Sequence, residues 1–408
     1  MPAKWRVVAM LWCIAFFNYA DRQAIFSVFP LLEREMHLTP VQLGLLGSGF
    51  AWVYGLAAPL AGVVVDRASR KRIVLAGLHA WSLICMATAA SRSFTHLFLF
   101  RAAEGLGETF YFPASTSLIS EHHDARTRSR ALGLHQTSVY LGTIGGGFFA
   151  GLIAERHGWR LSFIVFGALG ILLGVVLSRH LPDSPGTPDT PSTASTASTL
   201  STPSTSSTPR TPRTPRTPLF CLLGAFMCAN FVAVVLLSWM PKFLFDRFHM
   251  SLSTAGLTAT LFVQLASLAG APVGGWLADW WRQRTPAGRI LVQATGMFAG
   301  APFVAICGTT DSVAVLIVAL TCWGFFKGLY DANIFASAFD FVPPDARGRT
   351  AGVMNMVGWL AGGGSAPLVI GIVAERSSLG AAMAFTSVVY LAAGVLLVIA
   401  AVLARRAR

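Results

Sequence analysis

The chain carries little charge for its length. Only 12% of its 408 residues are charged, whereas a soluble domain carries about 25%. With 54% hydrophobic residues, the chain cannot cover itself with a soluble surface, which excludes a soluble enzyme or binding domain. Acidic residues are the scarcer kind, 18 against 31 basic ones. This excess predicts a membrane protein with basic cytoplasmic loops and no nucleic-acid partner.

Cysteine and catalytic motifs are also scarce. The six cysteines lie singly within apolar runs, without a CxxC pair, so we expect them in the core rather than in disulfides or metal sites. The sequence has no HExxH pattern and no nucleotide-binding glycine loop. We therefore predict that the protein is not an enzyme and has no cofactor and no bound metal.

Long apolar runs, in contrast, are abundant. A helix needs about 20 mostly apolar residues to cross a bilayer. Twelve such runs occur and predict an all-α membrane protein of twelve transmembrane helices in contact with the lipid bilayer. The predicted spans are 7–31, 41–65, 73–91, 95–120, 129–154, 159–180, 219–245, 252–279, 289–307, 311–340, 348–374 and 379–404.

One segment between the runs has a different composition. Residues 183–218 are almost all Ser, Thr and Pro and end in Thr-Pro-Arg repeats, so they have no apolar face to bury and predict a disordered cytoplasmic linker. The linker separates two six-span domains, residues 1–182 and residues 219–408. We expect these two domains to act as a single-chain monomer.

The distribution of Lys and Arg indicates the orientation. With both termini in the cytoplasm, the cytoplasmic segments hold 21 of the 31 basic residues and the outside loops hold 7. Basic residues are enriched in cytoplasmic loops. We therefore expect a multi-pass protein of the cell's inner (plasma) membrane with both termini in the cytoplasm.

Charged residues lie deep inside two of the predicted spans of the first half. Asp21 and Arg22 interrupt the first span, and Arg101, Glu104 and Glu108 share one face of the fourth at spacings i, i+3 and i+7. A charged side chain at the bilayer centre costs about 2.5–3.5 kcal/mol on insertion scales. We therefore expect these charges to line a water-filled pathway or to form buried pairs.

The two halves repeat a motif at the end of their second span. In the first half, three residues separate Gly62 from Asp66, and a basic cluster follows. Gly275 and Asp279 have the same spacing in the second half, again before basic residues. With the fourth-span pattern R-x-x-x-G-x-G, this motif resembles the major facilitator superfamily. The resemblance implies two six-helix repeats that rock about a central site. It implies gating roles for Asp66, Arg67, Arg70, Arg101, Asp279 and Arg282.

Within that superfamily the chain is most similar to the anion:cation symporters, which carry sugar acids and other organic anions. The similarity lies in Asn-Tyr-Ala-Asp-Arg (residues 18–22), in Gly-Leu-Gly-Glu followed by Phe-Pro-Ala (105–108 and 112–114), and in Gly-Trp-Arg (158–160). Spinster-like lipid transporters share the first two patterns but match less well after Glu108. They are the second resemblance.

The first resemblance implies a secondary active transporter that moves a small organic anion with protons by alternating access. It implies proton-coupling roles for Asp21 and Glu108, and contacts of Arg22 and Tyr19 with the substrate. The alternative for Asp21 is a fixed ion pair with Arg22 or Arg101. Sodium in place of the proton, a lysolipid as the substrate, and a non-transporting sensor on a transporter fold remain alternatives.

Other polar residues in the spans are further candidates for substrate contacts. Tyr54, Gln136 and Asn355 lie in spans two, five and eleven, and each is equally explained by an interhelical hydrogen bond. Lys327 and Asp331 are spaced i, i+4 in the tenth span. They predict either an internal ion pair or a second anion contact through Lys327.

Overall fold

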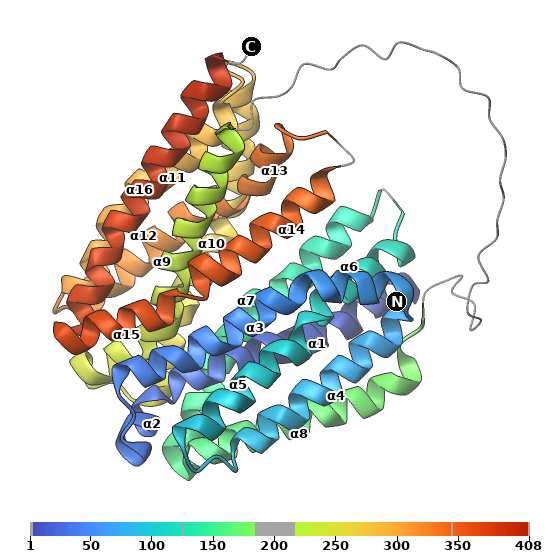
Figure 1. Cartoon of the computed structure of the whole chain (residues 1–408), viewed down its shortest axis with the longest axis vertical. Coiled ribbons are helices and arrows are strands. Elements are labelled where there is room, and N and C mark those ends of the chain that lie inside the picture. The colour runs from blue at the N-terminus through green and yellow to red at the C-terminus, as the bar shows by residue number, and fades with distance from the viewer. Residues whose placement is uncertain (1–2, 125, 184–216, 344–345, 407–408) are drawn as a thin grey trace.

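The computed structural model describes residues 3–124, 126–183, 217–343 and 346–406 (Figure 1). In this part of the chain every regular element is a helix, which confirms the all-α prediction. The helices form two bundles, α1–α8 and α9–α16, coloured from blue to green and from yellow-green to red in Figure 1. Most of the predicted linker lies outside the described residues.

The first bundle follows the predicted spans, except that two of them are broken. The first span is interrupted at Val28, and the fourth span is divided into α5 and α6. Pro113 has no N–H to donate to the carbonyl of Thr109, and the Thr109 hydroxyl donates to the Gly105 carbonyl at 2.7 Å. The helix therefore ends at Thr109 and restarts at Tyr111. The bundle consists of α1 (Ala3–Ser27), α2 (Phe29–Met36), α3 (Pro40–Arg67), α4 (Arg70–Thr88), α5 (Phe94–Thr109), α6 (Tyr111–His122), α7 (Arg128–His157) and α8 (Trp159–His180).

The second bundle also has two broken spans. The predicted tenth span is interrupted at Ala332 and Asn333, and the predicted eleventh span is interrupted by a π-helical turn. The π-helical turn, η2, replaces regular helix where the backbone is crowded, because a Cβ on Gly362 would lie 2.5 Å from the carbonyl oxygen of Met227. This turn carries Trp359. The bundle consists of α9 (Thr217–Phe248), α10 (Leu252–Arg282), α11 (Gly288–Thr309), α12 (Val313–Asp331), α13 (Ile334–Phe339), α14 (Arg347–Val357), η2 (Gly358–Gly363), α15 (Ala366–Arg376) and α16 (Leu379–Arg406).

Nine helical segments in the described residues are long and apolar enough to cross a membrane. The three other predicted spans coincide with α1, α4 and the α5–α6 pair. Polar residues explain the difference: α1 contains the Asp-Arg pair, α4 begins with Arg-Lys-Arg, and the 16-residue α5 contains an arginine and two glutamates. The weakest apolar spans are thus those that bring charge into the bundle.

The two bundles contact each other closely at the end that contains α2. There α7 lies against α10 with almost no space between the backbones, since a Cβ on Gly147 would lie 2.6 Å from the carbonyl oxygen of Gly256. Likewise, a Cβ on Gly371 of α15 would lie 2.4 Å from the carbonyl oxygen of Pro40 in α3. Glycine is needed at such positions because it alone has no Cβ. We call this end the closed end.

Polar contacts also join the halves at the closed end. Lys242 of α9 pairs with Glu33 of α2, and Glu155 of α7 accepts hydrogen bonds from the Ser253 backbone N–H at 2.8 Å and from its hydroxyl. At the opposite end, where Figure 1 marks both termini, no ion pair between described side chains joins the two halves. The described structure is therefore closed at one end only.

Gly147 provides a direct test of the closed end. We expect Gly147→Ala to force α7 away from α10 and to expose a cysteine introduced as Ser253→Cys to a membrane-impermeant thiol reagent. Gly133→Ala, on the same helix, is the control, because nothing lies within 4 Å of its added Cβ. Equal labelling in the two variants would contradict tight packing of α7 against α10.

Candidate functional site

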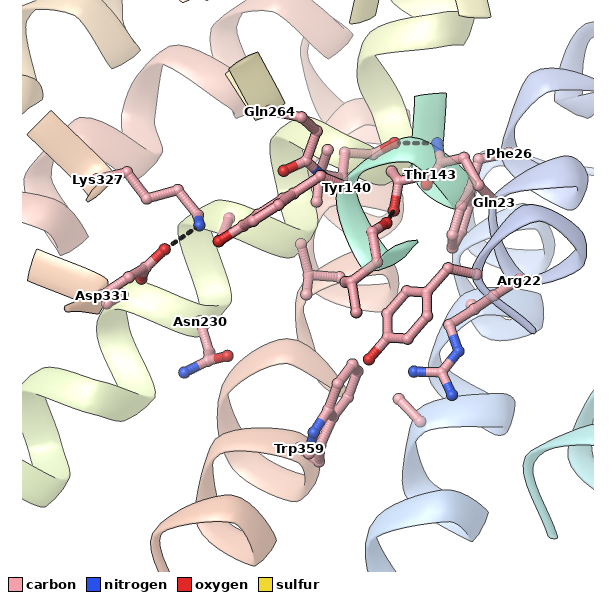
Figure 2. Close-up of a pocket in the computed structure, with 18 of the residues that line it drawn as sticks. Arg22, Gln23, Phe26, Tyr140, Thr143, Asn230, Gln264, Lys327, Asp331 and Trp359 are labelled. Carbon is pink, nitrogen blue, oxygen red and sulfur yellow. Dashed lines mark hydrogen bonds and ion pairs between the residues drawn. The ribbon is translucent and has the colours of Figure 1, made fainter. Parts of the chain in front are cut away.

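A cavity of about 310 Å³ lies between the two bundles (Figure 2). Helices α1, α3, α5 and α7 form its walls on one side, and α9, α10, α12, η2 and α16 form them on the other. This volume is at the small end of the range for small-molecule sites, about 300–1,000 Å³. The polar and charged wall residues are Tyr19, Arg22, Gln23, Arg101, Gln136, Tyr140, Thr143, Asn230, Gln264, Lys327, Tyr330, Asp331 and Tyr390.

Most of the predicted substrate-binding residues lie in this wall. Tyr54 does not line the cavity, but its ring lies 4.9 Å from the guanidinium carbon of Arg22. Asn355 is exposed on α14 and lies outside the wall. The four predicted residues that line the cavity are Tyr19, Arg22, Gln136 and Lys327.

Arg22 binds Glu108 across the first bundle. Its Nε and Nη2 atoms donate to Oε2 of Glu108 at 2.9 and 2.6 Å, and both side chains are at most 10% exposed. The third guanidinium nitrogen, Nη1, has no hydrogen-bond partner among the described residues. Arg22 therefore has one buried donor without a hydrogen-bond acceptor among the described residues.

Aromatic rings surround the Arg22 guanidinium. The ring centres of Tyr19 and Phe50 lie 4.7 and 4.8 Å from its central carbon, and that of Trp359 lies 5.7 Å away. Rings at these distances attract a cation and exclude water from its faces. Charge-assisted hydrogen bonds of this guanidinium are consequently stronger than they would be in water.

A second buried ion pair lies within α5. Arg101 and Glu104 are one turn apart and paired, and neither side chain is more than 1% exposed. Arg101 lines the cavity and lies 4.8 Å from the centre of the Phe50 ring. It therefore lies deep in the bundle, away from the other residues with predicted gating roles.

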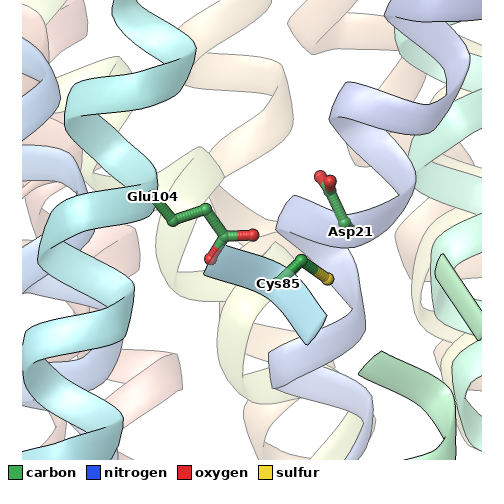
Figure 3. A group of neighbouring side chains, drawn as sticks. All are labelled: Asp21, Cys85 and Glu104. Carbon is green, nitrogen blue, oxygen red and sulfur yellow. The ribbon is translucent and has the colours of Figure 1, made fainter. Parts of the chain in front are cut away.

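Asp21 has no cation partner among the described residues. It is 3% exposed, and its Oδ1 atom accepts no hydrogen bond. Its carboxylate instead faces Glu104 and the thiol of Cys85, and the ligand atoms of the three side chains lie within 4.8 Å of one another (Figure 3). The structure therefore contains neither of the ion pairs considered for Asp21.

The charges of the buried side chains show that this arrangement requires a bound proton. Three carboxyl groups, those of Asp21, Glu104 and Glu108, are buried with the two guanidinium groups of Arg22 and Arg101. With all five groups ionised, the cluster carries a net charge of −1. Burial of an uncompensated charge is unfavourable. One bound proton makes the cluster neutral. Asp21 holds this proton most easily, because it has no cation partner and lies beside Glu104.

This count predicts unequal effects for the two members of the Arg101–Glu104 pair. Breaking a buried ion pair costs about 3–5 kcal/mol, and we expect that loss for Arg101→Met. Glu104→Gln should cost clearly less, because Asp21 can ionise beside Arg101 and replace the lost carboxylate. Thermal unfolding of the two purified variants in one detergent measures the difference. Equal destabilisation would contradict a shared proton.

The second bundle contributes its own charged pair to the same cavity. Lys327 and Asp331 of α12 form an ion pair one turn apart, and both line the wall. Figure 2 shows the side chain of Tyr140 extending from α7 toward this pair. The predicted ion pair is therefore present. Because it lies at the cavity, a second role of Lys327 as a contact for an anionic substrate stays a prediction.

The other residues with predicted gating roles lie at the end opposite the closed end. Arg70 pairs with Glu121 at 2.9 Å within the first half. Asp279 and Arg282 belong to a charged network within the second half, through Arg289 and Asp340. Arg67 is exposed, and the side chain of Asp66 lies outside the described residues. Their gating roles stay predictions.

Comparisons with known proteins identify the family. Residues 11–367 match the Major Facilitator Superfamily. The hexuronate transporter of Bacillus subtilis (strain 168) is 24% identical over 366 residues, which cover 88% of this chain and 85% of that protein. The probable galactarate/D-glucarate transporter GudP of Escherichia coli (strain K12) is 24% identical, covering 95% and 90%.

Two further comparisons agree with this family. A probable anion transporter 4, chloroplastic, of Oryza sativa subsp. japonica is 27% identical, and the chain spans 62% of its length. The crystal structure of a bacterial homolog to the human lysosomal transporter Spinster, inward-facing and occupied, shares the fold with a TM-score of 0.78 and 21% identity, over 100% of this chain and 97% of that one. The chain thus belongs to the Major Facilitator Superfamily and is a multi-pass membrane transporter, not an enzyme.

Proposed function

We propose that the chain is a proton-coupled symporter of a small organic anion, such as a sugar acid or another carboxylate. The observation that carries this proposal is the Arg22–Glu108 ion pair in the wall of the cavity between the two bundles. The relatives support the substrate class, since their names refer to hexuronate, galactarate and D-glucarate. Because one chain forms the whole cavity, we propose a monomer.

Arg22 is the anion-binding group. A guanidinium offers a planar fork of donors that matches a carboxylate. Its Nη1 is unpartnered, and two donors are used by Glu108. A substrate carboxylate that displaces Glu108 gains the same charge-assisted bonds in the same aromatic surroundings. Tyr19 and Gln136 line the wall nearby and supply hydrogen bonds to the rest of the substrate.

Coupling follows from the competition for Arg22. While Glu108 is ionised, it holds the guanidinium and the substrate is excluded. When Glu108 takes a proton, it loses its charge, and the substrate carboxylate becomes the counter-ion of Arg22. Both the empty and the loaded cavity are then neutral, whereas anion without proton or proton without anion leaves an uncompensated buried charge. Asp21 and Glu104 hold the additional proton of the cluster and pass it on.

The closed end shuts the cavity off from one side of the membrane, and alternating access requires this end to open. With both termini in the cytoplasm of a cell whose inner (plasma) membrane holds the chain, the closed end faces outside. Rocking of the bundles opens this end and brings the opposite ends together. Arg67 and Arg70 of the first motif then lie near Asp279 of the second, and Arg282 of the second lies near Asp66 of the first. These pairs between the halves hold the cytoplasmic side shut.

Uptake into proteoliposomes tests the proposal. The panel contains radiolabelled sugar acids, other carboxylates and a lysophospholipid, with an imposed inward proton gradient and, in parallel, an inward sodium gradient. We expect accumulation of a sugar acid driven by the proton gradient alone. Accumulation driven by sodium, movement of the lysophospholipid only, or binding without uptake would each overturn the proposal in favour of the corresponding alternative.

A further inference from the structure

We infer that the substrate is a diacid, a hydroxylated chain with a carboxylate at each end, whose second carboxylate binds Lys327 in exchange for Asp331. The inference rests on the proposed function and narrows its substrate class. It makes the Lys327–Asp331 pair a second proton-dependent anion site, in the half of the protein opposite Arg22.

The cavity has one cation–carboxylate pair on each side. Arg22 with Glu108 lies in the first bundle, and Lys327 with Asp331 lies in the second. Arg22, Lys327 and Asp331 all line the same wall. In the described part of that wall, Lys327 is the only cation from the second bundle. Each pair holds a cation that a substrate carboxylate reaches only by replacing the carboxylate already there.

Two tyrosines in the second-bundle wall of the cavity have unsatisfied hydroxyls. The hydroxyls of Tyr330 and Tyr390 have no hydrogen-bond partner among the described residues, although the two side chains are only 2% and 1% exposed. Both tyrosines line the cavity. A buried donor without a partner is costly, and a bound ligand is one of the ordinary reasons for keeping it. These hydroxyls therefore indicate that ligand oxygens belong at this end of the cavity.

Neutral polar side chains connect the two charged pairs. Figure 2 shows Gln264, Tyr140 and Thr143 between Lys327 on one side and Arg22 on the other. Asn230 lies near Asp331 and uses its amide nitrogen on the Phe226 carbonyl at 2.9 Å, which leaves its oxygen for a donor. Alternating donors and acceptors of this kind suit a chain of hydroxyl groups. A polyhydroxylated diacid matches the wall from end to end.

The second site changes the proton count. Asp331 takes a proton from water onto its carboxylate, Lys327 keeps its charge, and the second substrate carboxylate becomes its counter-ion. The other titratable side chains around the pair are Tyr140 of α7, Tyr330 of α12 and Tyr390 of α16, with Cys228 of α9 beside Tyr330. None of these is an acid that ionises near neutral pH. A diacid therefore enters with one more proton than the corresponding monoacid.

Two matched compounds separate the sites. Galactarate and galactonate share six carbons and the same internal hydroxyls and differ at one end, a carboxylate in the first and a hydroxymethyl group in the second. In proteoliposomes with a pH-sensitive dye, we expect the proton-to-substrate ratio for galactarate to exceed that for galactonate by one. Asp331→Asn should abolish net uptake of galactarate and keep its exchange, because the empty protein then holds an uncompensated Lys327.

A double variant tests binding without leaving a buried charge unpaired. Lys327→Gln with Asp331→Asn should raise KM for galactarate by about 10- to 100-fold, the effect of losing one hydrogen bond to a charged group, and change KM for galactonate less than about twofold. The control is Lys242→Gln with Asp246→Asn, an i, i+4 Lys–Asp pair of the same bundle outside the cavity wall. It should affect both compounds alike.

The outcomes distinguish this inference from the proposed function. Parallel changes for both compounds in the Lys327/Asp331 variant, equal proton ratios, or transport of galactonate without galactarate would overturn the inference and leave proton-coupled anion transport intact. Absence of proton-coupled movement of any sugar acid by the unmodified protein would overturn the proposed function itself, and the inference with it.

Discussion

Glu108→Gln should abolish proton-driven accumulation of the substrate while leaving exchange of labelled for unlabelled substrate across the membrane. The amide keeps the size of the carboxylate but carries no charge, so Arg22 stays available to the substrate in every state. The empty protein then holds an uncompensated guanidinium and cannot turn its cavity from one side of the membrane to the other. The loaded protein is neutral, so its cavity can still face either side. We expect at least about a 100-fold loss of accumulation, equivalent to about 2.8 kcal/mol at 1.4 kcal/mol per tenfold change.

The Glu108 experiment has a matched control in Glu35→Gln. Glu35 pairs with Arg160 on the surface of the same half, with both side chains more than 40% exposed. Exposed pairs contribute about 0–1 kcal/mol, so accumulation should stay near that of the unmodified protein. If Glu108→Gln lost exchange together with accumulation, the residue would serve binding or folding rather than coupling.

Arg22→Lys should weaken substrate binding by a factor on the order of 100, although the positive charge is kept. Lysine cannot reproduce the two parallel hydrogen bonds of the fork, and bonds to charged groups are worth about 1.5–3 kcal/mol each. Its ammonium can still pair with Glu108, so the variant should fold. Substrate affinity is measured from KM for counterflow, which requires no proton gradient.

Arg34→Lys is the control for Arg22→Lys. Arg34 is an exposed arginine of α2, and its guanidinium carbon lies 4.8 Å from the centre of the Phe245 ring, outside the cavity wall. Its replacement should leave KM nearly unchanged. Unchanged affinity in Arg22→Lys as well would move the anion site to the second bundle, with Lys327 as its cation.

The helices were predictable because an apolar run long enough to cross a bilayer has few other uses in a chain of this composition. The breaks within them were harder to predict. Pro113 and the glycines around Gly362 interrupt the fourth and eleventh spans, and both residue types are ordinary in membrane helices. Which proline breaks a helix depends on neighbouring side chains such as the Thr109 hydroxyl.

The charged residues of the site were predictable, but their pairing was not. Asp21 and Arg22 are adjacent in the sequence, yet neighbouring residues of a helix point about 100° apart, so they do not face each other. Arg22 instead meets Glu108, 86 positions away. That contact depends on how α1 and α5 are placed within the bundle, which a single sequence does not specify.

Most of the polar residues that the second bundle contributes to the cavity wall were not predicted from the sequence. Asn230 and Gln264 line it, whereas Asn355, the amide predicted from the sequence, is exposed. A lone amide in an apolar helix gives no periodic signal that says which way it faces. Tyr140, Tyr330 and Tyr390 were missed for a related reason, because aromatic residues are as common toward lipid as toward a cavity.

The most direct test of the account is proton movement caused by the substrate itself. Proteoliposomes that contain the protein and a trapped pH-sensitive dye receive an external sugar acid, with equal pH on both sides at the start. The account predicts internal acidification that follows the concentration of the sugar acid and disappears in Glu108→Gln. Uptake of the labelled sugar acid without any acidification would contradict it, because the Arg22–Glu108 pair would then not couple anion to proton.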